Sequence, residues 1–155
     1  MTALRPARPD DARALADLFW RVRHDNAATI PLPVHPRESV LPFVRGLVAD
    51  EEVWVATDGA TRVAFLVLRA EGEIDHLYVD STRTGSGVGS LLVALAKERR
   101  PAGLGLWVFA SNTGAVRFYE RHGFAVVGGT DGDNEEGAPD LRMQWRPVSA
   151  GGSPR

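Results

Sequence analysis

The chain has 155 residues, no cysteine and a formal net charge of −2, and this length suits a single domain with a sizeable core. The absence of cysteine excludes disulfides, thiolate catalysis and cysteine metal sites, and the near-neutral charge gives no electrostatic case for binding nucleic acid or an anionic membrane. No apolar run approaches the length of a transmembrane helix or a signal-peptide core, so we expect a cytoplasmic protein.

The first third of the chain predicts a strand and two helices. Residues 3–8 are typical of an opening strand, and Asp10 or Asp11 is expected to cap the helix that follows. Apolar residues of this helix repeat at helical spacing, at Ala12, Leu15, Leu18, Phe19 and Val22. Three of the ten prolines lie within residues 23–37 and favour an extended loop, after which residues 39–48 are expected to form the second helix.

The middle of the chain predicts three strands in a meander. Residues 53–57 and 63–69 are apolar and rich in β-branched side chains. The turn between them contains Asp58 and Gly59, which favours an antiparallel hairpin. A second short turn then leads to a strand that opens at Glu73.

A glycine-rich turn follows this strand and precedes a helix. Gly85, Gly87 and Gly89 permit backbone conformations closed to other residues and let a ligand approach the chain closely. The unpaired N–H groups at the start of the next helix can donate to phosphate oxygens. That helix has a predicted buried stripe at Val88, Leu91, Leu92 and Leu95. The turn is therefore a candidate phosphate site.

Two other phosphate motifs do not fit this turn. A P-loop would place lysine after its last glycine, but Gly89 is followed by Ser90. A dinucleotide fingerprint needs glycine at Ser90 and, roughly 20 residues on, a carboxylate that holds a ribose. That region reads GLGLWVFASN and has no carboxylate. Both observations count against a nucleotide-binding module.

The last third of the chain predicts a buried strand, a helix and two further strands. Residues 104–109 form the continuous apolar run of a buried strand. The next helix is expected to start at Asn112 as its N-cap and to end before Gly123. One face of this helix carries Ala115, Phe118, Tyr119 and His122. Residues 124–128 and 141–145 are expected to form the last two strands.

Two blocks of sequence resemble the Gcn5-related N-acetyltransferase (GNAT) superfamily. Residues 84–89, TGSGVG, resemble its coenzyme A signature, Arg/Gln-x-x-Gly-x-Gly/Ala, except that Thr84 replaces the usual Arg or Gln and Arg83 stands one residue early. Residues 112–124 resemble the pattern Asn-x-x-Ala-x-x-Phe-Tyr-Glu-x-x-Gly-Phe at each fixed position. The order of the predicted elements matches the family over nearly all of the chain.

The resemblance implies an α/β (α+β) fold with a mixed, mostly antiparallel sheet of about six to seven strands flanked by about four helices. In this family the fourth and fifth strands splay, and acetyl-CoA inserts its pantetheine arm between them as an added strand. Residues 1–148 would form this single domain and residues 149–155 a disordered tail. The implied cofactor contacts are Leu77, Tyr78, Val79, Thr84, Gly85, Ser86, Gly87, Val88, Gly89, Ser90 and Asn112.

The implied chemistry is acetyl transfer to an amine, which needs a proton acceptor because a free alkylamine has a pKa near ~10.4. Glu73 is the first candidate, since it lies as far before the glycine motif as the base carboxylate of histone-acetylating members. Asp75 shares its face by strand alternation, and a carboxylate pair could raise one pKa toward neutrality. A bulge in this strand would instead favour His76, relaying protons through water. A water chain without a single base is the other alternative.

The departing thiolate needs a proton donor, and the thioester carbonyl needs polarisation. The resemblance assigns the first role to Tyr119, whose alternative role is core packing beside Phe118. A backbone N–H at Leu77 or Tyr78 would stabilise the oxyanion. Asn112 would contact the pantetheine arm or would simply cap its helix.

The acceptor is expected to be a primary amine of a small molecule, a peptide or a protein. The loop GGTDGDNEEGAPD would form an acidic lip that attracts a cation, or would simply be solvated. Its acids are Asp131, Asp133, Glu135, Glu136 and Asp140. Further candidates for acceptor contact are His24, Asp25, Asn26 and His35. The acidic spacing fails the EF-hand pattern, which needs glycine where Glu136 stands, so no metal is expected.

The sequence leaves three functions open. The leading one is an acetyl-CoA-dependent N-acetyltransferase that acts by direct attack in a ternary complex. The second is a non-catalytic domain that binds or senses acyl-CoA, and the third is a nucleotide-binding module. The segment TDGDNEE resembles a subgroup of bacterial acetyltransferases. The sequence leaves open whether the protein is a homodimer.

Overall fold

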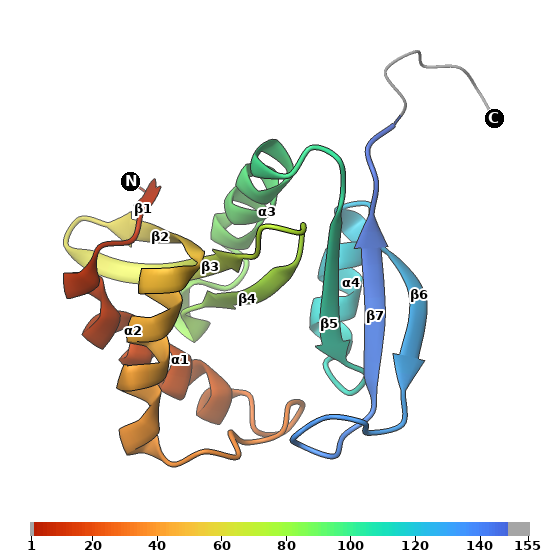
Figure 1. Cartoon of the computed structure of the whole chain (residues 1–155), viewed down its shortest axis with the longest axis horizontal. Helices are drawn as coiled ribbons and strands as arrows, with labels where there is room; N and C mark the ends of the chain where they lie inside the picture. The colour runs from red at the N-terminus through yellow and green to blue at the C-terminus, as the bar shows by residue number, and fades with distance from the viewer. Residues whose placement is uncertain (1, 149–155) are drawn as a thin grey trace.

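The computed structural model describes residues 2–148, in which seven strands and four α-helices build a layered α/β fold (Figure 1). The strands are Thr2–Pro6 (β1), Glu52–Asp58 (β2), Thr61–Leu68 (β3), Ile74–Val79 (β4), Leu104–Phe109 (β5), Ala125–Thr130 (β6) and Asp140–Trp145 (β7). The helices are Ala12–Asp25 (α1), Val40–Asp50 (α2), Val88–Arg99 (α3) and Thr113–Arg121 (α4). The predicted fold class is confirmed, whereas the predicted tail at 149–155 lies outside the described residues.

The sheet is divided into two antiparallel parts. One part has the strand order β1-β2-β3-β4 and the other has the order β5-β7-β6. They meet at an isolated parallel bridge between Glu73 and Gly105, where the Gly105 amide donates to the Gly72 carbonyl at 2.9 Å. Beyond this bridge β4 and β5 diverge (Figure 1). The predicted splay of the fourth and fifth strands is therefore confirmed.

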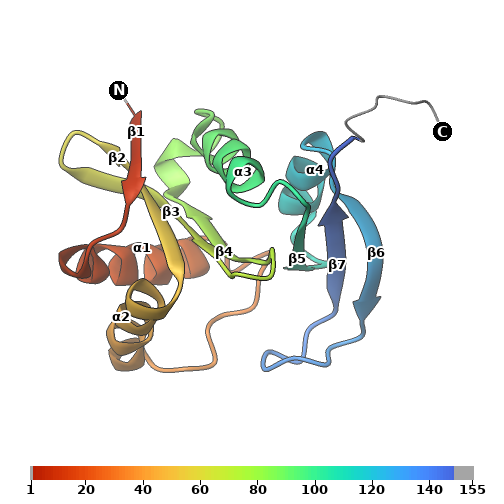
Figure 2. The same ribbon diagram turned by 45° about the horizontal axis from the view of Figure 1, so that its top comes forward.

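Apolar side chains are buried on both faces of the sheet. Helices α1 and α2 cover one face and α3 covers the other (Figure 2). Strand β3 shows why, because its side chains alternate between the faces. Phe65 and Val67 pack with α1 and α2, while Ala64, Leu66 and Leu68 pack with α3. A strand covered on both sides therefore reads as a continuous apolar run.

Two predictions about the helices are corrected in detail. Leu91 was expected in the buried stripe of α3 but is 46% exposed, while Val93 is buried in its place. Asp11 holds the N-cap position of α1 without capping it. Its carboxylate instead accepts hydrogen bonds from Arg5, from Arg62 and from the backbone N–H of Arg8. The acid that marks the start of the helix therefore ties the opening strand to β3.

Strand β4 contains a bulge at the position where the base candidates lie. The register with β3 changes from Val67 opposite His76 to Leu68 opposite Ile74, so Asp75 is the extra residue. Such a residue breaks the simple alternation of side chains along a strand. The alternation argument that placed Glu73 and Asp75 on one face therefore does not apply.

No helix in the described part of the chain is long and apolar enough to cross a membrane. Within the same residues, no cluster of three or more His, Cys, Asp or Glu side chains could hold a metal ion.

Candidate active site

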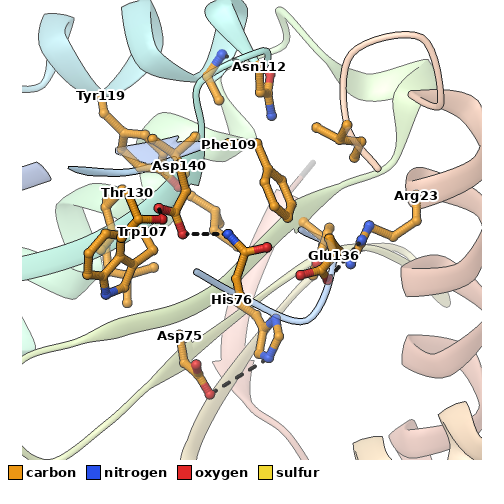
Figure 3. A pocket seen from close by; sticks show the side chains of 18 of the residues that line it. Arg23, Asp75, His76, Trp107, Phe109, Asn112, Tyr119, Thr130, Glu136 and Asp140 are labelled. Carbon is orange, nitrogen blue, oxygen red and sulfur yellow. Dashed lines mark hydrogen bonds and ion pairs between the residues drawn. The ribbon is translucent and has the colours of Figure 1, made fainter. Parts of the chain in front are cut away.

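Two neighbouring cavities lie along the splay of the sheet. The first, of about 690 Å³, lies between β4, β5 and the loop that joins β6 to β7, and we call it the β5 cavity (Figure 3). The second, of about 630 Å³, runs from the end of β4 to the glycine-rich turn and α4, and we call it the glycine-turn cavity. The residues that line both are Ile30, Leu77, Tyr78, Asn112, Ala115 and Tyr119.

The glycine-rich turn leaves its backbone open to a ligand. Gly85 and Gly87 have φ values of 81° and 90°, a region that favours glycine. A Cβ at either position would meet no atom within 4 Å. The first helical bond of α3 is donated by Leu91 N to Gly87 O at 3.0 Å, so the amides before it have no acceptor within the helix. These amides suit an anion such as a phosphate.

The predicted cofactor residues divide into two groups in the structure. Most of them line the glycine-turn cavity, and these are Leu77, Tyr78, Val79, Thr84, Gly85, Gly87, Gly89, Ser90 and Asn112. Val88 does not line it, because its side chain is buried in the core. Ser86 does not line it either, and its hydroxyl donates to the Arg83 carbonyl.

Two arginines that line the glycine-turn cavity were not predicted as contacts. Arg83, noted only as standing one residue early, lines the cavity while it pairs with Asp58. Arg121 lines it from the last turn of α4, three residues after Phe118. The i, i+3 spacing with Phe118 could have indicated Arg121. Both cations suit a ligand that carries phosphate.

Tyr119 stands where the two cavities meet. Its side chain comes from α4 and is 8% exposed. Burial raises the pKa of the Tyr119 hydroxyl, and the nearby Tyr78 raises it further. The hydroxyl is therefore protonated at neutral pH and can donate a proton. Asn112, at the start of the same helix, accepts from Ala115 N at 3.3 Å, so its role as a helix cap is confirmed.

The three base candidates have different surroundings. Glu73 forms an ion pair with Arg142, which also lies over the Trp107 ring, and Glu73 lines neither cavity. Asp75 and His76 both line the β5 cavity (Figure 3).

Asp75 and His76 form a contact pair. Asp75 accepts from Arg69 at 3.1 Å and lies 3.7 Å from His76 Nε2. Burial lowers the pKa of the His76 imidazole, although the Asp75 charge acts in the opposite direction. The ring is therefore neutral at pH 7 and can accept a proton.

Two buried charged residues line the β5 cavity from opposite sides (Figure 3). Arg23, from α1, donates to the Pro31 carbonyl at 2.8 Å and lies 3.6 Å from Glu136. Asp140, at the start of β7, accepts from the Thr130 hydroxyl at 2.6 Å and from the Asn134 amide at 3.0 Å. No spacing or motif in the sequence indicates that Arg23 is buried here.

The acids of the β6–β7 loop are placed differently from one another. Asp133, Glu136 and Asp140 line the β5 cavity, whereas Asp131 and Glu135 are exposed and do not. Glu135 pairs with His35 at 3.0 Å and so joins this loop to the α1–α2 loop. Of the other candidates for acceptor contact, Asn26 lines the glycine-turn cavity, His24 bonds the Trp20 carbonyl and Asp25 is exposed.

Known proteins that are similar in sequence to this chain are acetyltransferases. The family described as Acetyltransferase (GNAT) domain matches residues 49–126. The peptidyl-lysine N-acetyltransferase YjaB of Salmonella typhimurium is 33% identical over 135 residues, which make up 86% of this chain and 90% of YjaB. The chain therefore belongs to the GNAT family of acetyltransferases.

Solved structures show the same architecture. The solution structure of apo YjaB from Escherichia coli has a TM-score of 0.73 at 27% identity and covers 94% of this chain and 97% of that one. The crystal structure of the PaiA N-acetyltransferase of Thermoplasma acidophilum in complex with coenzyme A has a TM-score of 0.67 at 19% identity, with 95% and 99% covered. This second likeness supports the fold alone.

Proposed function

We propose that the protein transfers the acetyl group of acetyl-CoA to the side-chain amine of a peptidyl lysine, by direct attack in a ternary complex. The observation that carries this proposal is the position of Tyr119, whose protonated hydroxyl group belongs to a side chain that lines both cavities. The name of the YjaB relative supports lysine as the acceptor. The acetyltransferase family of the chain supports acetyl-CoA as the donor.

The residues of the glycine-turn cavity fit acetyl-CoA. The open turn at Gly85 and Gly87 and the first amides of α3 would hold the diphosphate. Arg83 and Arg121 add positive charge beside it. Beyond the Glu73 bridge, the edge of β4 that faces the splay has no strand partner among the described residues. This edge could pair with the amide groups of a pantetheine arm, which would direct the thioester toward Tyr119.

The chemistry then moves protons away from the acceptor nitrogen and one proton to the sulfur. At neutral pH the acceptor is an ammonium ion, which loses one proton to a base and then attacks the thioester carbonyl carbon, while a backbone N–H of β4 at Leu77 or Tyr78 stabilises the oxyanion. The nitrogen loses its second proton as the carbon–sulfur bond breaks, and the Tyr119 hydroxyl protonates the departing thiolate. One of the two protons restores the tyrosine through solvent and the other is released, so that atoms and charge balance over one turnover.

His76, supported by Asp75, is the base that we propose. Both side chains line the β5 cavity, and the His76 ring is neutral at pH 7 because burial lowers its pKa. Glu73, the first candidate from the sequence, is instead engaged by Arg142. A water chain to His76 serves the same role if the amine does not reach the ring directly.

The two tyrosines of the chain provide a matched test of the proton donor. Both line both cavities, but only Tyr119 is proposed to protonate the thiolate. Tyr119→Phe should lower kcat about tenfold to a thousandfold, with little change in the calorimetric affinity for acetyl-CoA. Tyr78→Phe should change kcat far less. Full turnover by Tyr119→Phe would contradict the role. Absence of turnover in the wild type itself would favour a non-catalytic acyl-CoA-binding domain.

The base assignment has its own comparison. His76→Gln should lower kcat and remove the acidic limb of the pH profile of kcat/KM, which reports the essential base. Glu73→Gln should leave both unchanged. The reverse result would return the role of base to Glu73.

A further inference from the structure

Three charged side chains are buried among residues 2–148, and two of them line the β5 cavity. Asp11, Arg23 and Asp140 are 0%, 7% and 9% exposed. Asp11 lies away from the cavity, whereas Arg23 and Asp140 lie on opposite sides of it (Figure 3). The cavity thus has a cationic pole on α1 and an anionic pole at the start of β7.

Asp140 is a buried carboxylate without a cationic partner among the described residues. Its oxygens accept from the neutral Thr130 hydroxyl and Asn134 amide, and no Lys, Arg or His of the described chain lies within ion-pair distance. A carboxylate can accept about four hydrogen bonds, and a buried charge is costly unless it is paired. Asp140 therefore retains acceptor capacity and negative charge on the cavity wall.

Arg23 retains a donor on the other wall. Its Nη2 atom donates to the Pro31 carbonyl, and Glu136 at 3.6 Å is too distant for a hydrogen bond. Its Nε–H group is buried and has no hydrogen-bond partner, a state that costs about 1–3 kcal/mol. Glu136 offsets the charge of Arg23 but does not satisfy this donor. The Tyr78 hydroxyl also lies beside Arg23, whose charge acts to lower the pKa of that hydroxyl against the larger effect of burial. Because Nε–H has almost no exposed surface, an oxygen of a ligand reaches it with a small movement of the Arg23 or Tyr78 side chain.

We infer that the β5 cavity recognises an acceptor by two groups at once: an ammonium against Asp140 and a carbonyl or carboxylate oxygen against Arg23 Nε. This inference rests on the proposed function and deepens it. The aromatic side chains of Tyr78, Trp107 and Phe109 also line the cavity and suit an aliphatic chain. Lysine in a peptide or as a free amino acid carries both groups, whereas polyamines and simple alkylamines lack the oxygen.

Asp140→Asn tests the anionic pole. Thr130 Oγ1 already accepts from the backbone N–H groups of Gly132 and Asp133, so it has no lone pair left for a third donor. The asparagine oxygen therefore keeps the bond from Thr130, and the bond from the Asn134 amide is lost together with the charge. Asp131→Asn is the matched control, because it removes the same charge from an exposed position on the same loop that does not line the cavity.

The readout is binding of a lysine peptide, measured by calorimetry in the presence of coenzyme A, so that it does not depend on turnover. Asp140→Asn should weaken the peptide at least about tenfold, as loss of a charged hydrogen-bond partner does, without changing the affinity for coenzyme A. Asp131→Asn should match the wild type. A peptide with an aminooxy side chain, whose nitrogen is uncharged at neutral pH, should bind Asp140→Asn and the wild type equally. Unchanged lysine-peptide binding in Asp140→Asn would overturn the inference.

The oxygen contact is tested with the wild type and with Arg23→Lys, which keeps the charge beside Glu136 but lacks Nε–H. The wild type should bind the lysine peptide at least about tenfold more tightly than an alkylamine of equal chain length, and Arg23→Lys should reduce that preference. If free lysine binds more tightly than the peptide, the oxygen comes from a carboxylate. If the peptide binds more tightly than free lysine, the oxygen comes from a carbonyl. Equal binding of peptide and alkylamine to the wild type would overturn the inference.

Failure of the proposed function would be a different result. In that case the wild type would acetylate no amine, whatever its binding selectivity. Amine acetylation by the wild type together with unaltered peptide binding by Asp140→Asn would remove only the inference about the two poles.

Discussion

Asp11 and Asp140 are two buried carboxylates of one chain with opposite surroundings. Asp11 is held by Arg5 at 2.7 and 2.8 Å, by Arg62 at 3.0 Å and by the backbone N–H of Arg8. Asp140 has only neutral donors and faces a cavity. Burial alone therefore does not reveal what a charged residue does. The partner does, because a charge compensated within the chain stabilises the fold, and one left uncompensated is available to a ligand.

The largest effect should come from removing the compensated carboxylate. Asp11→Ala leaves two arginines without their anion and should lower the free energy of unfolding by about 3–5 kcal/mol, measured by denaturant titration at neutral pH. Asp10→Ala is the neighbouring control, because Asp10 is exposed and its single ion pair, with Arg8, is long at 3.6 Å. The free energy of unfolding of this variant should stay within about 0.5 kcal/mol of the wild type. If Asp11→Ala lowered the free energy of unfolding as little as Asp10→Ala does, Asp11 would not stabilise the fold through its arginine partners.

The arginine partners of Asp11 also predict that stability depends on pH. The bonds from Arg5 first, and then those from the Arg8 backbone and Arg62, lower the pKa of Asp11 against the opposing effect of burial. A carboxyl group with a lowered folded-state pKa stabilises the fold above its unfolded pKa of about 3.9 and loses this contribution as the pH falls below it. In acid titrations of unfolding, stability should fall more steeply for the wild type than for Asp11→Asn, by up to about 1.4 kcal/mol per pH unit. Parallel curves would show that Asp11 does not carry this dependence.

The smallest effect should come from Asp140. Asp140→Asn loses the bond from Asn134 and removes an uncompensated charge, so the free energy of unfolding should fall by about 1 kcal/mol. Thermal and chemical unfolding should show a loss of this size relative to Asp131→Asn. A loss as large as that of Asp11→Ala would show that Asp140, like Asp11, stabilises the fold.

The sequence predicted most of the fold because local signals agreed with packing. The strand at 104–109 was predicted with the bounds that the structure has, since a continuous apolar run follows Pro101 and Gly103. Leu91 was misassigned because the spacing of apolar residues in α3 fits more than one buried face. The face that packs depends on the sheet beneath it, which a single helix does not encode.

The features of the two cavities that follow from the residues themselves are those that are local in sequence. The glycine-rich turn and the Asn112 cap were found because their residues are adjacent along the chain. The bulge at Asp75 depends on the register with β3, and the paired poles depend on α1 and β7 meeting across the cavity. Such distant contacts leave no spacing that the sequence alone would show.

The narrow junction between the two parts of the sheet has a consequence for the order of binding. Glu73 and Gly105 form the one backbone bridge described between the two parts of the sheet, so backbone pairing joins these parts at only one end of the splay. A coenzyme bound between β4 and β5 would pair with both strands and should slow hydrogen–deuterium exchange of their amides. The acceptor cavity would then be ordered only after the coenzyme has bound, which favours a kinetic order in which acetyl-CoA binds first and the amine second.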